Sequence, residues 1–553
     1  MATRGIAAVE PEQPARAAGG SGVYRWYVLF VLMLVYAFNY VDRQIITILA
    51  VHIKADLGIS DAQFGLLFGT AFAVFYGLFG IPMARLADGW RRVSLLSASL
   101  TFWSGMTALS GFANSFVQLG AARIGVGVGE AGATPAAVSL IGDYFERGIR
   151  ATVLSIYSIG VYVGAGAALM IGGPVVIGWA ETFGPPSEAP LGLAGWQAAF
   201  LVAGIPGIVL ALIVFLTVRE PQRGIMDGRR DEDDPAPMRA ALRELGTMFP
   251  PWSLLGLRAG AQAGPFGRNL VILAIAVIGG ATIAVLTDRM LPAEQVSVVA
   301  TFGAFDLTAN HIQWIAMGLA FYALASWFQH VQQANPAARQ FITASRTFRL
   351  VTLAGAGLAF TMNAVNGFIF VYASRFHDMG PEIGFRFGAM AIVFGAAGIA
   401  ASGLLSDLSR KRSISGRLYY AALSTACLTA ILFAQFTASS ALVFTLCYAA
   451  ATFFMPMWFA PLQATTQDLV PPKQRGLAFA VFSIGPNVLG LGLGPYAIGL
   501  ISDATGDLRL ALLAAASLGV ASIICLLLAA RTLPQDEAQT LRYIEGGTAD
   551  GAA

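Results

Sequence analysis

Charged residues, histidine and cysteine are all scarce in this chain of 553 residues. Asp, Glu, Lys and Arg make up only 12% of it, about half the share found in an average soluble protein. None of its three lysines ends a glycine-rich phosphate-binding loop, which argues against an ATP-driven pump, and its four histidines form no metal-binding pattern. Three scattered cysteines indicate neither a metal site nor a disulfide framework. We therefore expect no metal, no cofactor and no enzyme active site.

Apolar residues dominate instead, at 56% of the chain with a mean hydropathy of +0.68. Runs close to the roughly 20 residues that a helix needs to cross a bilayer fall into two sets of six. Composition and runs together predict an all-α integral membrane protein. The predicted spans are 26–51, 62–86, 93–113, 115–142, 151–179 and 196–218 in the first half, and 348–372, 384–405, 417–437, 439–466, 476–502 and 508–530 in the second.

The stretch between the two sets is too long to be a simple linker. Its first part, 221–268, is charged and then amphipathic, as expected of a helix in the headgroup layer. Its second part, 269–344, holds two more apolar runs, 269–287 and 312–330. They predict an inserted transmembrane hairpin and raise the expected number of spans to 14, with an interfacial or re-entrant pair as the alternative.

Basic residues are distributed unevenly between the two sides of this topology. With both termini in the cytoplasm, 27 of the 34 Lys and Arg lie on the cytoplasmic side, 5 lie on the opposite side and 2 lie within spans. The positive-inside rule favours this orientation, and the excess of arginine over lysine suggests a bacterial inner membrane. The expected domains are a flexible cytoplasmic tail (1–23), an N-terminal bundle (24–220), a cytoplasmic linker (221–268), the hairpin (269–344), a C-terminal bundle (345–531) and a second cytoplasmic tail (532–553).

Charged and polar residues recur in the two halves at nearly constant offsets. Three separate segments match in this way, which predicts two homologous six-helix bundles of the same topology. The matches are Asp143 and Arg150 with Asp468 and Arg475 at an offset of 325, Asn39 and Asp42 with Asn363 and Asn366 at 324, and Asp88, Arg91 and Arg92 with Asp407, Arg410 and Lys411 at 319.

Several segments carry a family resemblance. GIPMARLADGWRR (80–92) and its echo GLLSDLSRKR (403–412) resemble the loop signature of the major facilitator superfamily. NYVDRQIITIL (39–49), IKADLGISDAQFGLLFG (53–69) and RIGVGVGEAG (123–132) resemble its Spinster branch, whose animal members are linked to export of sphingolipids and lysolipids. The resemblance implies alternating access with a cytoplasmic gate of acidic and basic residues. We assign to this gate Asp88, Arg91, Arg92, Asp143, Arg150, Asp407, Arg410, Lys411, Asp468 and Arg475.

Four charged residues interrupt the predicted spans, where each costs roughly 2.5–3.5 kcal/mol and needs a partner or a function. Asp42 and Arg43 project about 100° apart on a helix and reach different partners, whereas Arg123 and Glu130 share one helix face. Because the resemblance places these helices around a central cavity, we expect Asp42 and Glu130 to couple proton movement. Arg43 would bind the anionic part of a substrate and be held by Asp42 when the cavity is empty; a purely structural ion pair is the alternative. Further expected substrate contacts are Asn39, Arg123, Asn363, Asn366 and Met455.

The second half offers an apolar counterpart to this charged group. Its stretch 453–459 is bulky and could accept a hydrocarbon chain, or could simply face lipid. We therefore predict a proton-coupled secondary active transporter of an amphipathic substrate, with export favoured, acting as a monomer in the bilayer and binding no nucleic acid. The alternatives are a proton symporter or uniporter of a small polar solute and a transporter-like sensor without flux.

Overall fold

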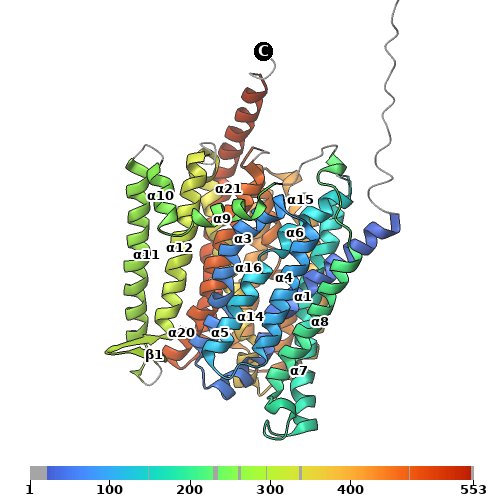
Figure 1. Ribbon diagram of the computed structural model, residues 1–553, viewed down its shortest axis with the longest axis vertical. Helices are drawn as coiled ribbons and strands as arrows, with labels where there is room; N and C mark the ends of the chain where they lie inside the picture. Colours follow the sequence, from blue (N-terminus) through green and yellow to red (C-terminus); the bar gives the residue numbers. More distant parts are fainter. Residues whose placement is uncertain are drawn as a thin grey trace, which may run out of the picture.

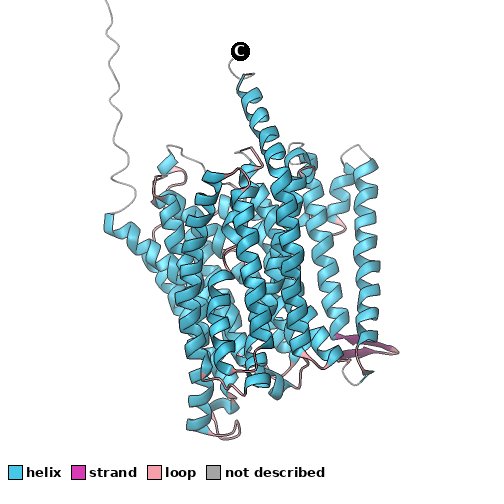
Figure 2. Ribbon diagram, turned by 180° about the vertical axis from the view of Figure 1, so that it is seen from behind, coloured by secondary structure: helices cyan, strands magenta, loops and turns pink. Residues whose placement is uncertain are grey.

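The computed structural model describes residues 22–146, 148–227, 234–259, 263–293, 296–334, 339–471 and 474–549, and the elements of this part are helices joined by loops, with one pair of strands (Figure 2). Twelve of the described helical stretches are long and apolar enough to cross a membrane. They comprise eleven of the twelve predicted bundle spans and the helix that contains the predicted run 269–287. Helices α4 (Arg92–Ser110) and α12 (Ala309–Ala334) lie alongside the others in Figure 1 but are less apolar, so the count of fourteen spans stays a prediction.

The first six spans form the N-terminal bundle. Local signals start several of its helices: Ser60 and Gln63 form a capping box before α2, and Ser115 caps α5 through the amide of Gln118. A π-helical turn, η1, joins α2 to α3 within one span. The elements are α1 (Gly22–Leu57), α2 (Asp61–Gly65), η1 (Leu66–Thr70), α3 (Ala71–Gly89), α4 (Arg92–Ser110), α5 (Phe116–Glu130), α6 (Ala133–Tyr144), α7 (Arg150–Phe183), η2 (Pro190–Gly192) and α8 (Gly195–Thr217).

The last six spans form the C-terminal bundle, with the same succession of helices. Its fifth span contains a longer π-helical segment, η7, and its last helix continues without a break through most of the predicted tail, to Ala549. The elements are α14 (Arg346–His377), α15 (Ile383–Arg412), α16 (Gly416–Thr437), α17 (Ala441–Phe454), α18 (Phe459–Asp468), α19 (Arg475–Ile484), η7 (Gly485–Leu493), α20 (Gly494–Thr505) and α21 (Leu508–Ala549).

The fourth span of each bundle breaks at nearly the same register. In the N-terminal bundle the break follows Glu130, and in the C-terminal bundle it follows Phe454, so that Met455 lies within it. The two residues are related by the offset of 325 found in the sequence. The repeat is therefore also a repeat of helix boundaries, because the two fourth spans are interrupted within one residue of equivalent points.

The segment between the bundles folds as a linker followed by a helical hairpin. Short helices η3 (Ile225–Asp227), α9 (Pro237–Gly246) and α10 (Trp252–Ala259) lead into α11 (Ala263–Met290). Strands β1 (Val298–Phe302) and β2 (Phe305–Thr308) pair antiparallel, and α12 (Ala309–Ala334) and η5 (Arg339–Thr343) return to the C-terminal bundle. The predicted amphipathic segment is thus helical, and α11 and α12 contain the two predicted runs. We call residues 234–334 the insert; η5 lies outside it and packs in the apolar core of the C-terminal bundle, where Phe341 and Ile342 are buried.

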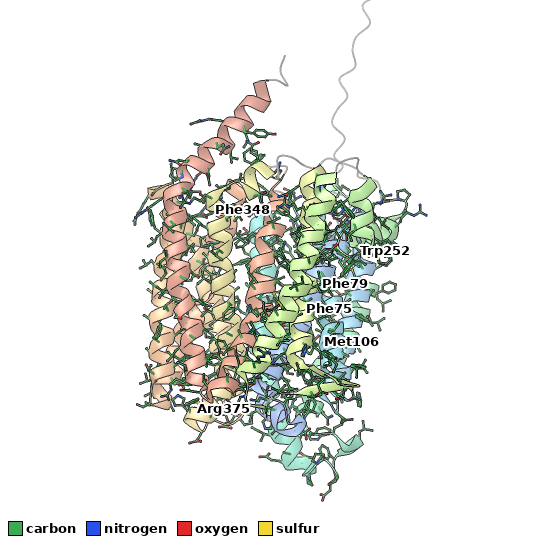
Figure 3. All side chains as sticks on the ribbon, turned by 90° about the vertical axis from the view of Figure 1, so that its left-hand side faces the viewer. Phe75, Phe79, Met106, Trp252, Phe348 and Arg375 are labelled. Carbon is green, nitrogen blue, oxygen red and sulfur yellow. The ribbon has the colours of Figure 1, made fainter. Side chains whose placement is uncertain are left out.

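The molecule has two distinct ends. The start of α1, the linker helices and the last described turn of α21 lie at one end, at the top of Figure 1, and β1 and the end of α7 lie at the other. We call them the Asp88 end and the Asp61 end after a residue at each; in Figure 3, Phe348 and Arg375 mark the two ends of α14. Residues 1–21, most of the predicted first tail, lie outside the described residues.

The two bundles contact one another most closely towards the Asp61 end. Gly65 of α2 lies so near α20 that a side chain there would come within 2.3 Å of the carbonyl oxygen of Pro495. Farther along the same seam, the Thr70 hydroxyl donates to the carbonyl oxygen of Gly492 at 2.5 Å, joining the two π-helical segments. Among the described residues, every hydrogen bond between the bundles lies from this contact to the Asp61 end.

Candidate functional site

Helix α1 directs Asp42 and Arg43 to different neighbours. Asp42 is fully buried and its Oδ2 accepts a hydrogen bond from the hydroxyl of Ser104 in α4 at 3.1 Å. Arg43 Nη2 instead donates to Oε2 of Glu130 in α5 at 2.7 Å, forming an ion pair. The expectation that Asp42 holds Arg43 is therefore wrong, because the angle of about 100° between successive residues turns Asp42 towards α4.

Aromatic rings surround the guanidinium of Arg43. Its central carbon lies 4.4 Å from the ring centre of Phe72, 4.8 Å from that of Tyr40 and 5.1 Å from that of Tyr76. Each ring face attracts a cation, and more strongly where water is excluded. Arg43 thus has one ionic partner, Glu130, and an aromatic cage that stabilises its charge in this position.

Arg123 attaches α5 to α1 through the backbone. It is fully buried, and its two terminal nitrogens donate to the carbonyl oxygens of Asp42 at 2.9 Å and Arg43 at 3.4 Å. Glu130 lies on the same face of α5, as the spacing predicts. Close packing of this helix requires glycine, since a side chain on Gly127 would come within 2.5 Å of the carbonyl oxygen of Phe72.

This group of charged residues has unused hydrogen-bonding capacity. Within the described part of the chain, Oδ1 of Asp42, Oε1 of Glu130 and the Nε atoms of Arg43 and Arg123 make no hydrogen bond. Asn39, one turn before Arg43, is buried next to Glu130. Buried polar groups are normally paired, so an unsatisfied cluster is a place where a proton or a polar ligand can bind.

The predicted substrate contacts on the C-terminal bundle carry no charge. The Asn363 amide donates to the carbonyl oxygen of Ala359 at 2.8 Å within its own helix. Asn366 and Met455 are half-buried, and Met455 packs against the apolar core between the bundles. These side chains lie on α14 and at the break between α17 and α18, so they do not join the charged group directly.

At the Asp88 end, the gate residues of the N-terminal bundle form a buried ion cluster. Arg92, the first residue of α4, pairs with Asp143 at the end of α6 and with Glu220, whose Oε1 lies 2.8 Å from Nε. Arg150 donates to the carbonyl oxygens of Gly142 and Phe145 at 2.6 and 3.2 Å. The cluster therefore connects the ends of several helices of one bundle.

The remaining residues of the first gate motif lie at the surface. Asp88 and Arg91 are exposed. Asp88 borders a cavity of about 460 Å³ between α3 and α9, together with Arg85, Arg243 and Glu244. The linker helix thus lies over the predicted gate loop.

The C-terminal bundle has an equivalent but more exposed cluster. Arg417 donates from Nη1 to Asp468 at 2.6 Å and from Nη2 to Asp407 at 2.9 Å. Arg410 pairs with Glu537 on the extension of α21, while Lys411 and Arg475 are exposed. The structure therefore brings Asp407 and Asp468 together through Arg417, a residue that the sequence reasoning missed.

The sequence repeat could have revealed Arg417, but it gave no indication of Glu220. Adding the offset of 325, which relates Asp143 to Asp468, to Arg92 leads directly to Arg417. The offset of 319 instead paired Arg92 with Lys411, but α15 continues through Arg412 before α16 begins, so Lys411 still belongs to the preceding helix. Glu220 carried no such signal, because it lies at the boundary of the predicted bundle.

At the opposite end, a charged network joins the two bundles. Asp61 is nearly fully buried and pairs with Lys54 of α1 and with Arg375 of α14, whose Nη1 and Nη2 lie 2.7 and 2.8 Å from its two oxygens. Ser502 of α20 donates to the same carboxylate at 2.7 Å. The carboxylate of Asp503 accepts from the backbone amides of Asp61 and Ala62 at 3.0 and 2.7 Å.

We call Lys54, Asp61, Arg375, Ser502 and Asp503 the Asp61 network. Its two cations balance its two carboxylates, and its members come from both bundles, so it fastens them at this end. Sequence reasoning counted Lys54 and Arg375 only as topological markers. The signal was the position of Asp61 inside a capping box at the start of a span, on the side with few basic residues.

A comparison with protein-family models identifies the family of this chain. The model described as Major Facilitator Superfamily matches residues 32–488, with a second match at 351–547. The chain belongs to the Major Facilitator Superfamily. As a member of this superfamily it is a membrane transporter and not an enzyme, as the sequence predicts.

Particular superfamily members resemble the chain over different lengths. An MFS-type efflux pump of Mycolicibacterium smegmatis is 36% identical over 193 residues, 35% of this chain and 42% of the pump. A probable galactarate/D-glucarate transporter of Bacillus subtilis is 30% identical over 213 residues, 37% of this chain and 43% of the transporter. The matched stretches thus span less than half of these curated relatives.

A solved structure matches almost the whole superfamily fold of this chain. It is a bacterial homologue of the human lysosomal transporter Spinster, in an inward-facing and unoccupied conformation. It is 25% identical with a TM-score of 0.66, and the match covers 94% of this chain and 99% of that one. The predicted resemblance to the Spinster branch is confirmed.

Proposed function

We propose that this superfamily member is a proton-coupled transporter that moves an amphipathic organic substrate by alternating access. The observation that carries the proposal is the buried ion pair of Arg43 and Glu130 beside Asp42 and Arg123. Charges inside a membrane protein are costly to bury and mark pathways for ions and substrates. All four lie in spans of one bundle, where a small shift of a helix can change their partners.

The contacts support different roles for the two carboxylates. Glu130 is neutralised by Arg43, and taking up a proton would weaken that ion pair and release the arginine. The Asp42 carboxylate accepts from the Ser104 hydroxyl through Oδ2, and its Oδ1 makes no hydrogen bond within the described residues and can bind a proton. We propose that proton binding at these two groups is coupled to movement of α1 against α4 and α5.

Arg43 would then bind the anionic part of the substrate. Its planar guanidinium suits phosphate or carboxylate, and it stays charged under all relevant conditions. The half-buried Asn363, Asn366 and Met455 would supply uncharged contacts for the rest of the molecule. This division between a charged and an apolar wall favours a lipid-like substrate with an anionic or zwitterionic head.

The orientation follows from the basic residues. The Asp88 end carries most of the described ones, so the positive-inside rule makes it the cytoplasmic end, with the start of α1 and the end of α21 there. Because the bundles are bonded at the Asp61 end, we propose that the conformation described is closed towards the outside, like the inward-facing Spinster homologue. We favour export across a bacterial inner membrane by a monomer.

Reconstitution into liposomes tests the proposal. Purified protein is placed in vesicles that contain a pH dye, and lysolipids, sphingoid lipids and amphipathic drugs are added in turn. We expect substrate-evoked proton movement that disappears in Asp42→Asn and in Glu130→Gln while both variants stay folded. Undiminished proton movement in both variants would overturn the assignment of the coupling residues.

A small polar acid is the second candidate substrate. It is favoured by the similarity to the B. subtilis sugar-acid transporter, and Arg43 would bind its carboxylate equally well. The same vesicles distinguish the two, since sugar acids would then evoke proton movement and lipids would not. Binding of a substrate without any flux would instead indicate a sensor.

A further inference from the structure

The insert is a rigid unit. Near the Asp88 end, Asn269 of α11 is fully buried and accepts from the Tyr322 hydroxyl at 2.8 Å, and its amide donates to Ser326 and Gln329 at 3.0 Å each. Near the Asp61 end, the Asn310 amide donates to Asp288 at 2.7 Å. Hydrogen-bonded polar groups at both ends of a helix pair fix its geometry.

The insert covers the seam between the bundles from the lipid side. Met317 and Trp327 of α12 pack in one cluster with Val74 and Leu78 of α3 and with Val488 of η7. Figure 3 views the molecule from this side, and Phe75 and Phe79 of α3, which pack against the same cluster, are labelled there beside the insert. α12 therefore contacts both halves of the seam.

Attachment to the N-terminal bundle occurs at both ends. At the Asp61 end, the Gln63 amide of α2 donates to the Ser297 hydroxyl at 2.6 Å. At the Asp88 end, Ala241 of α9 is buried against α3. Within the insert, α9 is in turn bonded to α12, because the Trp327 indole donates to Glu244 at 2.8 Å. Gly89 lies so close to the linker that a side chain would come within 2.8 Å of Cβ of Asp234.

Attachment to the C-terminal bundle combines packing of α12 on η7 with a polar contact at one end. The Tyr496 hydroxyl of α20 donates to Oδ1 of Asn310 at 2.8 Å and also lies beside Thr287 and Trp314 of the insert. It lies at the Asp61 end, as does the Gln63 contact on the other side of the seam. If this end opens, α2 and α20 separate, and a rigid insert cannot keep both bonds.

We propose that the insert moves as part of the N-terminal bundle and that the Tyr496–Asn310 contact is a latch, which holds the C-terminal bundle against it while the Asp61 end is closed. The contact with α20 is the one that breaks, because both α9 and α12 pack on α3 of the N-terminal bundle. The inference rests on the alternating access proposed above and adds a moving part to it.

Distances between spin labels test which bundle the insert follows. In a variant with Cys427, Cys447 and Cys525 replaced by serine, labels are placed in pairs at three exposed positions of the Asp61 end: Ser187 in the N-terminal bundle, Ala304 in the insert and Ser440 in the C-terminal bundle. Asp61→Asn is added to favour opening. We expect the 187–440 and 304–440 distances to lengthen while the 187–304 distance stays constant. A constant 304–440 distance with a changing 187–304 distance would overturn the proposal.

Removal of one hydroxyl tests the latch. Tyr496→Phe keeps the ring against Trp314 but loses the hydrogen bond, and it should raise the ratio of open to closed 187–440 distances by roughly fivefold. Tyr372→Phe is the matched control, since it loses a hydroxyl bond of 2.7 Å to the carbonyl of Phe436 inside one bundle. Equal ratios in the two variants would remove the latch.

A double variant tests whether Tyr496 and Asn310 act as a pair. Adding Asn310→Ala to Tyr496→Phe should change the ratio little more, because the bond between these two residues is already lost and the bond of Asn310 to Asp288 lies inside the insert; additive effects would contradict the pairing. If the 187–440 pair gives one unchanging distance under every condition, including Asp61→Asn, alternating access itself fails and the latch with it.

Discussion

The two bundles have the same succession of helices and the same break in their fourth spans, but only one carries charge at its centre. At the register of Arg43, Arg123 and Glu130, the C-terminal bundle has Gly367, Tyr448 and Met455. Tyr448 stacks on Phe387, with 4.1 Å between the ring centres, where Arg123 makes hydrogen bonds. Aromatic packing thus takes the place of ionic contacts.

The charge difference between the bundles shows that the fold does not require a charged group at its centre. The C-terminal bundle bends at Met455 without a carboxylate, so Glu130 is not required to make the break. Buried ion pairs often stabilise a protein no better than apolar residues of similar size. The charged group is therefore best explained by function, and changing the residues at matched positions tests this explanation.

The largest expected effect follows when the N-terminal bundle is made to resemble its partner. Glu130→Met leaves Arg43 buried without its counterion, which should cost about 3–5 kcal/mol of stability, and proton-coupled transport should fall to the level of empty liposomes. Thermal unfolding in detergent and the liposome assay measure the two effects. Adding Arg43→Gln should restore much of the stability but no transport, and a double variant as unstable as Glu130→Met would contradict the ion-pair explanation.

The two bundles also differ in the burial of their ion clusters at the Asp88 end, which are centred on Arg92 and Arg417. The side chain of Arg92 is 1% exposed and bonds two carboxylates, whereas that of Arg417 is 18% exposed and its partner Asp407 is 68% exposed. Arg92→Gln should therefore destabilise by about 3 kcal/mol, and Arg417→Gln by about 1 kcal/mol or less. Thermal unfolding of the two variants side by side tests this, and equal losses would show that the clusters are energetically equivalent.

The Asp61 network should control opening more than stability. Asp61→Asn weakens its bonds to Lys54 and Arg375 and should shift the equilibrium towards an open Asp61 end by about 1–3 kcal/mol. Thr70→Cys in a cysteine-free background reports this, because the side chain lies buried on the seam. Labelling from outside should increase in Asp61→Asn and stay unchanged in the exposed control Glu188→Gln; equal labelling in all three would contradict the network's role.

Local patterns predicted much of the fold, and long-range contacts were harder. Span lengths and the repeat indicated both bundles, and the spacing of Arg123 and Glu130 indicated their shared face. The partner of Arg43 could not be predicted, because nothing in the sequence shows which of several neighbouring helices a residue meets. Arg375 was missed for the same reason: it meets Asp61 across 314 positions of the chain.

The smallest expected effect concerns the apolar side of the comparison. Met455→Leu nearly conserves volume and apolar character, so transport should change by no more than about twofold, with the change confined to substrates that differ in hydrocarbon length.

Arg43→Lys in turn keeps the charge but loses the planar guanidinium, and it should weaken transport of phosphate-headed lipids more than that of cationic amphiphiles. A series of lysolipids that varies either the chain or the head, assayed in the same liposomes, separates the two effects. Two results would contradict the proposed roles of these residues. One is a change of head-group preference in Met455→Leu, and the other is a change of chain-length preference alone in Arg43→Lys.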